Sequence, residues 1–248
     1  MCIVFCFSGL WVLGSQPKSV VLSQDMFLAQ RMGEDYNDFQ TELEAYDFNR
    51  LVDELSNDDL KMVFWLNIYN IYAQIGLENY DSLYLNHRRK FFKNEFIKVA
   101  GESFSLDDIE HGILRRSQTL WGRGRVRKWF PGKVERQLRV NELDYRIHFG
   151  LNCGAKSCPP IAYFETENLD EQLTEAAKTF ILSTSEYDDI RNMVFISKIF
   201  SWYRGDFGGK SGIRELLKKY GAVPKKSGRV KIEFKDYDWS VNTSNYAD

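Results

Sequence analysis

The apolar and polar positions of the chain predict helices interspersed with short strands. Residues 19–55 show helical spacing of apolar positions, with acidic positions between them. A stronger signal follows, because residues 56–59 (SNDD) offer N-cap side chains to a long, almost wholly apolar helix over residues 60–80. A helix with so few polar positions is expected to be buried on most of its sides.

Shorter elements are predicted along the rest of the chain. Residues 96–106 alternate and turn at 100–102, as a β-hairpin does, and a short helix starts near Leu106. Residues 145–154, with the sequence YRIHFGLNCG, predict a buried strand that enters a turn. The remaining elements are helices over 169–183 and 211–221, a strand over 192–200, and a last strand with its exit over 229–242.

This order of elements predicts the fold class. Helices and strands alternate without regular βαβ units, so we expect a single α+β domain with a central, mainly antiparallel sheet flanked by helices. The 248 residues, 44% of them hydrophobic, are enough to bury one sizeable core. We divide the chain into an apolar segment at 1–16, a helical N-terminal part at 17–63 and the main domain at 64–248.

The apolar run at the start of the chain predicts export. Its sequence, MCIVFCFSGLWVLG, has about the length of a secretory hydrophobic region and is too short to span a membrane. A basic region before it is missing, and Ser15-Gln16 is a poor cleavage site. The length and apolar character of the run nevertheless predict export to a periplasmic or extracellular location. A buried N-terminal strand or helix is the alternative.

Charge is balanced overall but concentrated in one segment. The net charge of −2 excludes attraction of the whole molecule to nucleic acid or to an anionic membrane. Residues 115–139, which we call the basic loop, contain nine Lys or Arg against one Glu, with Trp121, Trp129 and Phe130 among them. A clamp for a phosphate or an anionic polymer is one interpretation. A solvated surface loop is the favoured one, because no nucleic-acid-binding fold accompanies it.

The densest chemical signal is the stretch HFGLNCGAKSCPP at residues 148–160. It holds two of the four cysteines, and the other two, Cys2 and Cys6, lie in the apolar run at the start. In an oxidising compartment Cys153 and Cys158 are able to pair. In a reducing one the same residues are better suited to bind metal or to act as a nucleophile.

A thiol nucleophile is the chemistry that we favour. A thiolate needs an imidazole to accept its proton, a group to orient that imidazole and donors for an oxyanion. This predicts acyl chemistry on the amide or ester bond of a small molecule or peptide. The candidate catalytic residues are Cys153, His111, His148, Asn67, Asn70 and Glu110.

Three alternatives stay open at this point. The two histidines and two cysteines make a formal zinc set, but the histidines are not at the spacing typical of structural zinc sites. A disulfide between Cys153 and Cys158 in a non-catalytic ligand- or protein-binding module is the second. The third concerns Asn67 and Asn70, whose amides can instead satisfy the backbone of a neighbouring loop. The sequence indicates no cofactor, no metal and no oligomeric state.

A second polar and aromatic stretch, IFSWYRGDF at residues 199–207, fits the wall of a cleft. It combines an aromatic face with a charged pair. The candidate substrate-binding residues are Cys158, Trp202, Tyr203, Arg204 and Asp206.

Five of these stretches together resemble a known family. They are FWLNIYN at 64–70, IEHGILR at 109–115, DYRIHFGLNCGAKSCPPI at 144–161, IFSWYRGDF at 199–207 and YDWSVN at 237–242. In this order they resemble the domain of unknown function 547 family over residues 64–242. The resemblance implies a shared fold and leaves the reaction to be argued from the residues themselves.

Overall fold

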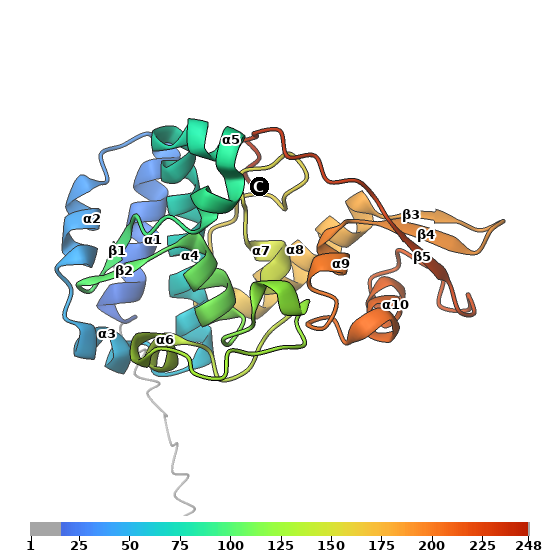
Figure 1. The fold of residues 1–248 in the computed structure, drawn as a ribbon, viewed down its shortest axis with the longest axis horizontal. Helices are drawn as coiled ribbons and strands as arrows, with labels where there is room; N and C mark the ends of the chain where they lie inside the picture. The colour runs from blue at the N-terminus through green and yellow to red at the C-terminus, as the bar shows by residue number, and fades with distance from the viewer. Residues whose placement is uncertain (1–15, 248) are drawn as a thin grey trace, which may run out of the picture.

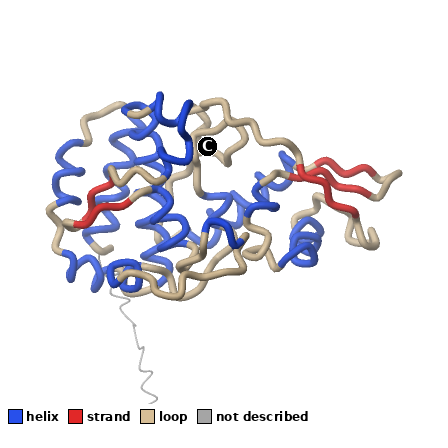
Figure 2. Tube along the Cα trace, viewed as in Figure 1, coloured by secondary structure: helices blue, strands red, loops and turns tan. Residues whose placement is uncertain are grey.

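The computed structural model describes residues 16–247. The apolar run at residues 1–14, with its predicted role in export, lies outside the described residues. Helices surround the long central helix α4 at one end of the molecule, and a three-stranded sheet lies at the other end (Figures 1 and 2). Within residues 16–247, no helix has the length and apolar character needed to cross a bilayer.

The helices and strands follow one another in a mixed order. The N-terminal half contains α1 (Lys18–Met32), α2 (Asn37–Glu44), α3 (Phe48–Glu54), α4 (Asp58–Asn79), α5 (Asp81–Phe92), β1 (Ile97–Val99), β2 (Glu102–Phe104), the π-helix η1 (Asp108–Leu114) and the 3₁₀-helix η2 (Leu120–Gly122). The C-terminal half contains α6 (Lys133–Leu138), α7 (Ile147–Gly150), α8 (Leu169–Thr184), β3 (Glu186–Asp188), β4 (Met193–Ile196), α9 (Ile199–Trp202), α10 (Gly209–Lys219) and β5 (Lys231–Phe234).

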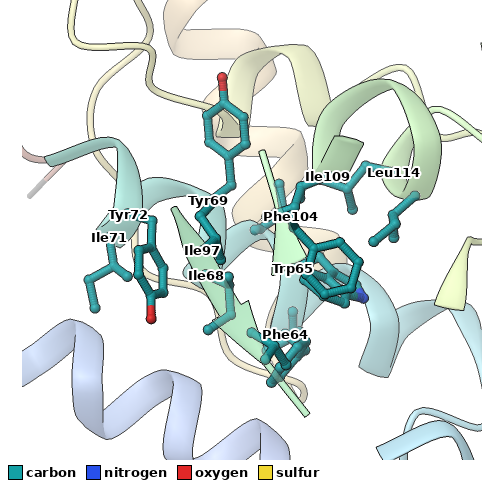
Figure 3. Close-up of a cluster of buried hydrophobic side chains, with 14 of the residues drawn as sticks. Phe64, Trp65, Ile68, Tyr69, Ile71, Tyr72, Ile97, Phe104, Ile109 and Leu114 are labelled. Carbon is teal, nitrogen blue, oxygen red and sulfur yellow. The ribbon is translucent and has the colours of Figure 1, made fainter. Parts of the chain in front are cut away.

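Helix α4 is the predicted long helix, and the prediction is confirmed. It begins after Asn57, whose side chain accepts a hydrogen bond from the Leu60 backbone N–H at 3.0 Å. Every residue from Lys61 to Leu77 is buried. Helices α1, α5 and η1 contact it, and its Trp65 packs edge-on against Phe104 of the hairpin, with ring centroids 5.1 Å apart (Figure 3).

The α+β class is confirmed, although its strands form two small sheets instead of one central sheet. Strands β1 and β2 form the predicted antiparallel hairpin, which turns at Ala100 and Gly101. The second sheet has the order β3-β4-β5, with β3 antiparallel and β5 parallel to β4. Helices α9 and α10 lie between β4 and β5 in the chain, and such a crossover is what allows two strands to pair in parallel.

The strand predicted at residues 145–154 is wrong, because the structure has the short helix α7 there. The Asp144 carboxylate accepts a hydrogen bond from the Arg146 backbone N–H at 2.8 Å and so favours a turn at this point. Ile147 then packs in one hydrophobic cluster and Phe149 in another. The apolar positions alternate here because Ile147 and Phe149 contact two separate clusters. An apolar run this short does not distinguish a strand from a helix.

Three buried amides on one face of α4 hold the loop that follows α7. Asn67 donates to the Phe164 carbonyl and accepts from the Phe164 N–H, both at 2.9 Å. Asn70 donates to the carbonyls of Gly150 and Ala162 and accepts from the Asn152 N–H. Gln74 donates to the Asn152 side chain at 3.3 Å. We call these three residues the amide row.

Replacement of Asn70 by leucine is expected to destabilise the fold. The leucine side chain removes three hydrogen bonds and leaves buried backbone groups without partners, which is expected to lower the free energy of unfolding by about 2–4 kcal/mol. Asn86→Leu is the matched control. Asn86 is exposed on α5, so a change within about 0.5 kcal/mol is expected there. Equal denaturation curves for the two variants would contradict a structural role for the amide row.

Candidate active-site cavity

A cavity of about 400 Å³ lies where the two hydrophobic clusters meet. Tyr69 and Leu151 line it from one side, and Ile199 and Trp202 line it from the other. Its polar and sulfur-bearing lining residues come from segments that are far apart in the chain. They are Asp107, Glu110, His111, Arg123, His148, Cys153, Cys158, Tyr203 and Tyr237.

The two cysteines in the cavity wall form a disulfide in this structure. Gly154 follows Cys153 with a φ of +78°, and a Cβ at this glycine would lie 2.2 Å from Leu77 of α4. Glycine is therefore required for the chain to turn this close to the helix. Asn152 completes the turn by accepting from the Gly154 N–H and donating to the Pro159 carbonyl. The loop that holds the disulfide is thus fixed to α4 at both ends.

The C-terminal segment lies across the cysteine loop and completes one wall of the cavity. The N–H of Lys156 donates to the Ser240 carbonyl at 2.8 Å, and the N–H of Asn242 donates to the Gly154 carbonyl at 2.8 Å. This pairing brings the Tyr237 hydroxyl to 3.3 Å from the Cys153 Sγ and 3.1 Å from the Cys158 Sγ. In Figure 1 the red segment after β5 runs back to this region near the C-terminus.

A buried ion pair network fixes His148. Its Nε2 lies 2.8 Å from the Asp206 carboxylate, and its ring stacks on Tyr203 with centroids 4.0 Å apart. The same carboxylate accepts from the Arg115 Nε at 2.7 Å. The side chains of Arg115 and Asp206 are 1% and 0% exposed, so the pair is wholly enclosed. Each buried charge compensates the other, and removal of either one would leave the remaining charge unpaired and destabilise the fold.

The π-helix η1 brings Asp107, Glu110 and His111 to the cavity. The His111 Nδ1 lies 2.7 Å from the Arg115 Nη1 and 3.5 Å from the Glu110 Oε1, and its Nε2 lies 3.7 Å from the Asp107 carboxylate. The Glu110 Oε1 is buried without a hydrogen-bond partner within the described chain. A buried carboxylate oxygen of this kind is available to a ligand in the cavity.

Burial separates the pKa values of these groups. It raises the pKa of Asp107 to about 7, with repulsion from Glu110 as a second cause. It lowers the pKa of His111 to about 4, against the attraction of Glu110. For Glu110, burial acts to raise the pKa, but His111 and Arg115 together hold it below its usual value. Near neutral pH, the cavity therefore contains a neutral imidazole, a carboxylate and a carboxyl group that titrates.

The cavity brings together four of the six predicted catalytic residues and three of the five predicted substrate-binding residues. Glu110, His111, His148 and Cys153 line it, as do Cys158, Trp202 and Tyr203. Asn67 and Asn70 lie behind it, where they bind backbone groups. Asp206 supports His148 from outside the lining, and the Arg204 guanidinium lies over the Phe234 ring, 5.6 Å from its centroid.

The formal zinc set is not assembled around one point. Among residues 16–247, no group of three or more His, Cys, Asp or Glu is arranged to hold a metal ion. Cys153 and Cys158 use their sulfurs in the disulfide, and His148 uses its Nε2 on Asp206.

Three residues of the site were not predicted from the sequence. The sequence places Asp107 only at the start of a helix and Arg115 among the cations of the basic loop. It places Tyr237 in the exit from the last strand. The signal that could have identified Asp107 is its spacing, because it lies three and four residues before Glu110 and His111, on the same face of a helical turn.

The family described as "Protein of unknown function, DUF547" matches residues 52–181. The chain belongs to the DUF547 family. The DUF547 match includes α4, η1 and the cysteine loop and ends in α8, so the stretches at 199–207 and 237–242 lie beyond it. No match was found among curated proteins or among solved structures.

Asp107→Asn is expected to change the pH dependence of stability. A carboxyl with a raised pKa in the folded state binds more protons than in the unfolded state, so its effect on stability becomes less favourable as pH rises from about 4 to about 7. The free energy of unfolding of Asp107→Asn, measured relative to that of the wild type, should therefore be about 2 kcal/mol higher at pH 8 than at pH 5. Urea denaturation of both proteins at the two pH values measures this difference. A difference independent of pH would show that Asp107 ionises normally.

Proposed function

We propose that this DUF547 domain is a thiol-dependent enzyme in which Cys153, once released from its disulfide, attacks the carbonyl carbon of an amide or ester. The observation that supports this proposal is that a single cavity is lined by both sulfurs, both imidazoles and two carboxyl groups. Cys153 is the half-buried cysteine and Cys158 the buried one, so the Cys153 sulfur is the more accessible nucleophile.

The reaction begins with reduction of the disulfide by a dithiol, which becomes oxidised as two cysteine thiols form. A neutral imidazole then accepts the Cys153 thiol proton as the sulfur bonds to the carbonyl carbon. Of His111 and His148, His148 is the more suitable base, because the Arg115 guanidinium already donates to the His111 Nδ1 at 2.7 Å. The carbon–nitrogen or carbon–oxygen bond breaks, and the leaving amine or alcohol takes that proton. Water hydrolyses the resulting thioester and regenerates the Cys153 thiol.

Two donors near the sulfurs are suited to stabilise the oxyanion of this reaction. The Tyr237 hydroxyl lies within 3.3 Å of both sulfurs. The Cys153 backbone N–H, which donates to the Cys158 Sγ at 2.9 Å in the disulfide form, is the second donor, provided that Cys158 moves away from it on reduction. Preorganised donors of this kind stabilise charge that develops in a transition state.

The disulfide also supports the proposal that the protein is exported. Disulfides persist in oxidising compartments and are rare in a reducing cytosol. In an exported protein, Cys153 would rest in the disulfide form until a dithiol reaches the cavity. The amide or ester chemistry would then depend on the local redox state.

Thiol–disulfide exchange is a second candidate function. It is favoured by the position of both sulfurs in the cavity wall and by the Tyr237 hydroxyl, which is able to stabilise either thiolate as it leaves. Equilibration with glutathione buffers distinguishes this function from a structural bridge. A reduction potential above about −250 mV is expected for a redox centre, and one below about −300 mV for a structural disulfide.

Alkylation of the reduced protein tests for an activated thiol. With the reductant removed, iodoacetamide at neutral pH should modify Cys153 at least about tenfold faster than Cys158, as peptide mass mapping would measure. His111→Gln or His148→Gln should slow this modification. His87→Gln is the matched control, because His87 is exposed on α5 and should leave the rate unchanged.

An acyl-transfer readout separates the two candidate functions. The reduced protein should acquire an acetyl group on Cys153 from p-nitrophenyl acetate, and Cys153→Ser should not. Slow alkylation at both cysteines, insensitive to both histidine replacements, would overturn the proposed nucleophile. Fast alkylation without an acetyl adduct would instead favour thiol–disulfide exchange.

A further inference from the structure

We propose that the basic loop binds the surface of an anionic phospholipid membrane. The loop contains a second hollow, of about 380 Å³, separate in its lining from the cavity described above. Its lining combines cations with aromatic residues and contains no carboxylate. The lining residues are Arg116, Arg127, Lys128, Trp129, Phe130, Pro131, Arg136 and Arg139.

Two guanidinium groups in this hollow are available to a ligand. Within residues 16–247, the side chains of Arg116 and Arg127 make no hydrogen bond and no ion pair. Lys128 is paired with Glu135 at 2.9 Å, and Arg139 donates to the Ser117 hydroxyl at 2.8 Å. A guanidinium group binds the oxygens of a phosphodiester with two parallel hydrogen bonds, so this hollow suits a lipid phosphate.

Large aromatic side chains project beside these cations. Trp129 is 87% exposed and Phe130, which comes directly before Pro131, is 91% exposed. Trp121, at the other end of the same loop, is 75% exposed. Apolar groups of this size are seldom left in water together without a partner. Tryptophan with nearby Arg and Lys is the combination that anchors proteins at the headgroup level of a bilayer.

The arrangement favours a membrane over single-stranded nucleic acid. Proteins that bind single strands use aromatic rings as platforms within a groove, where successive bases stack. Trp129 and Phe130 stand at the edge of the hollow and are almost fully exposed, as is suited to insertion between headgroups. Because the whole chain has a net charge of −2, the attraction for anions comes from the basic loop and not from the molecule as a whole. An attraction confined to one loop requires a partner with a dense anionic surface.

Membrane binding through this loop would also orient the first cavity. Leu120, Trp121 and Arg123 of the basic loop line that cavity as well. Helix α6, at the C-terminal end of the loop, lies at the lower edge of the molecule in Figure 1. The part of the cavity that Leu120, Trp121 and Arg123 line would therefore be held close to the bilayer.

Vesicle flotation with the whole protein tests the proposal. Vesicles of phosphatidylcholine and phosphatidylglycerol in equal parts should bind the protein at low salt at least about tenfold more tightly than vesicles of phosphatidylcholine alone. Raising the salt concentration should weaken this binding, because salt screens exposed charges. Equal binding to both kinds of vesicle, or binding to neither, would overturn the proposal.

Matched variants assign the binding to the loop. R116Q/R127Q should weaken vesicle binding about tenfold, whereas K225Q/K226Q, which removes the same charge from another exposed loop, should not. W129S/F130S should weaken it by a similar factor, whereas Ile190→Ser should not, although Ile190 is 99% exposed. Loss of binding in the control variants to the same degree would overturn the assignment to the basic loop.

Two further measurements test whether Trp129 enters the bilayer and whether the partner is instead a nucleic acid. Quenching of tryptophan fluorescence by brominated lipid should be reduced in Trp129→Phe, a change that leaves an aromatic ring in place and does not disturb a buried position. Binding of a thymidine oligonucleotide that is lost in W129S/F130S, with no binding of vesicles, would replace the membrane by single-stranded nucleic acid as the partner.

Discussion

The buried amides of the amide row are the constraint on which the site depends. Helix α4 is almost entirely enclosed by apolar side chains, and within that setting each amide must find partners or destabilise the fold. The partners that satisfy Asn67 and Asn70 are backbone groups of residues 150–164. The position of the disulfide is therefore determined by a helix about eighty residues earlier in the chain. The polar residues of the longest apolar helix act as the framework of the cavity.

A second constraint joins η1 to the segment after α9 through buried charge. Arg115 comes from the end of η1, and Asp206 comes from the turn after α9, and neither has access to water. Such a pair contributes less to net stability than its short distance suggests, because both charges lose their hydration. The role of the pair here is positional, because it fixes His148 relative to the π-helix η1. The imidazoles in the cavity consequently keep defined orientations, with the His111 side chain 7% exposed and that of His148 1% exposed.

The sequence predicts the elements better than it predicts the site. The N-cap at Asn57, the long apolar helix and the hairpin turn follow from local chemistry, and the structure contains all three. The strand predicted at 145–154 failed because Ile147 and Phe149 serve two different clusters, which a local pattern does not reveal. Tyr237 was missed for a similar reason, because its role arises from segments that meet only in the folded chain. The cysteine loop is recognisable from residues 148–160 alone, and Asp107 is separable by its local spacing from Glu110 and His111.

The pairing of the C-terminal segment with the cysteine loop has a consequence for the order of folding. Tyr237 and the strand-like contacts of residues 240–242 reach a loop that precedes them by about eighty residues. During synthesis, the α4 helix and the cysteine loop emerge well before residues 237–242, which supply the last wall of the cavity. Contacts of such long range form slowly. The cysteine loop can therefore be held on α4 before the C-terminal segment closes the cavity over it.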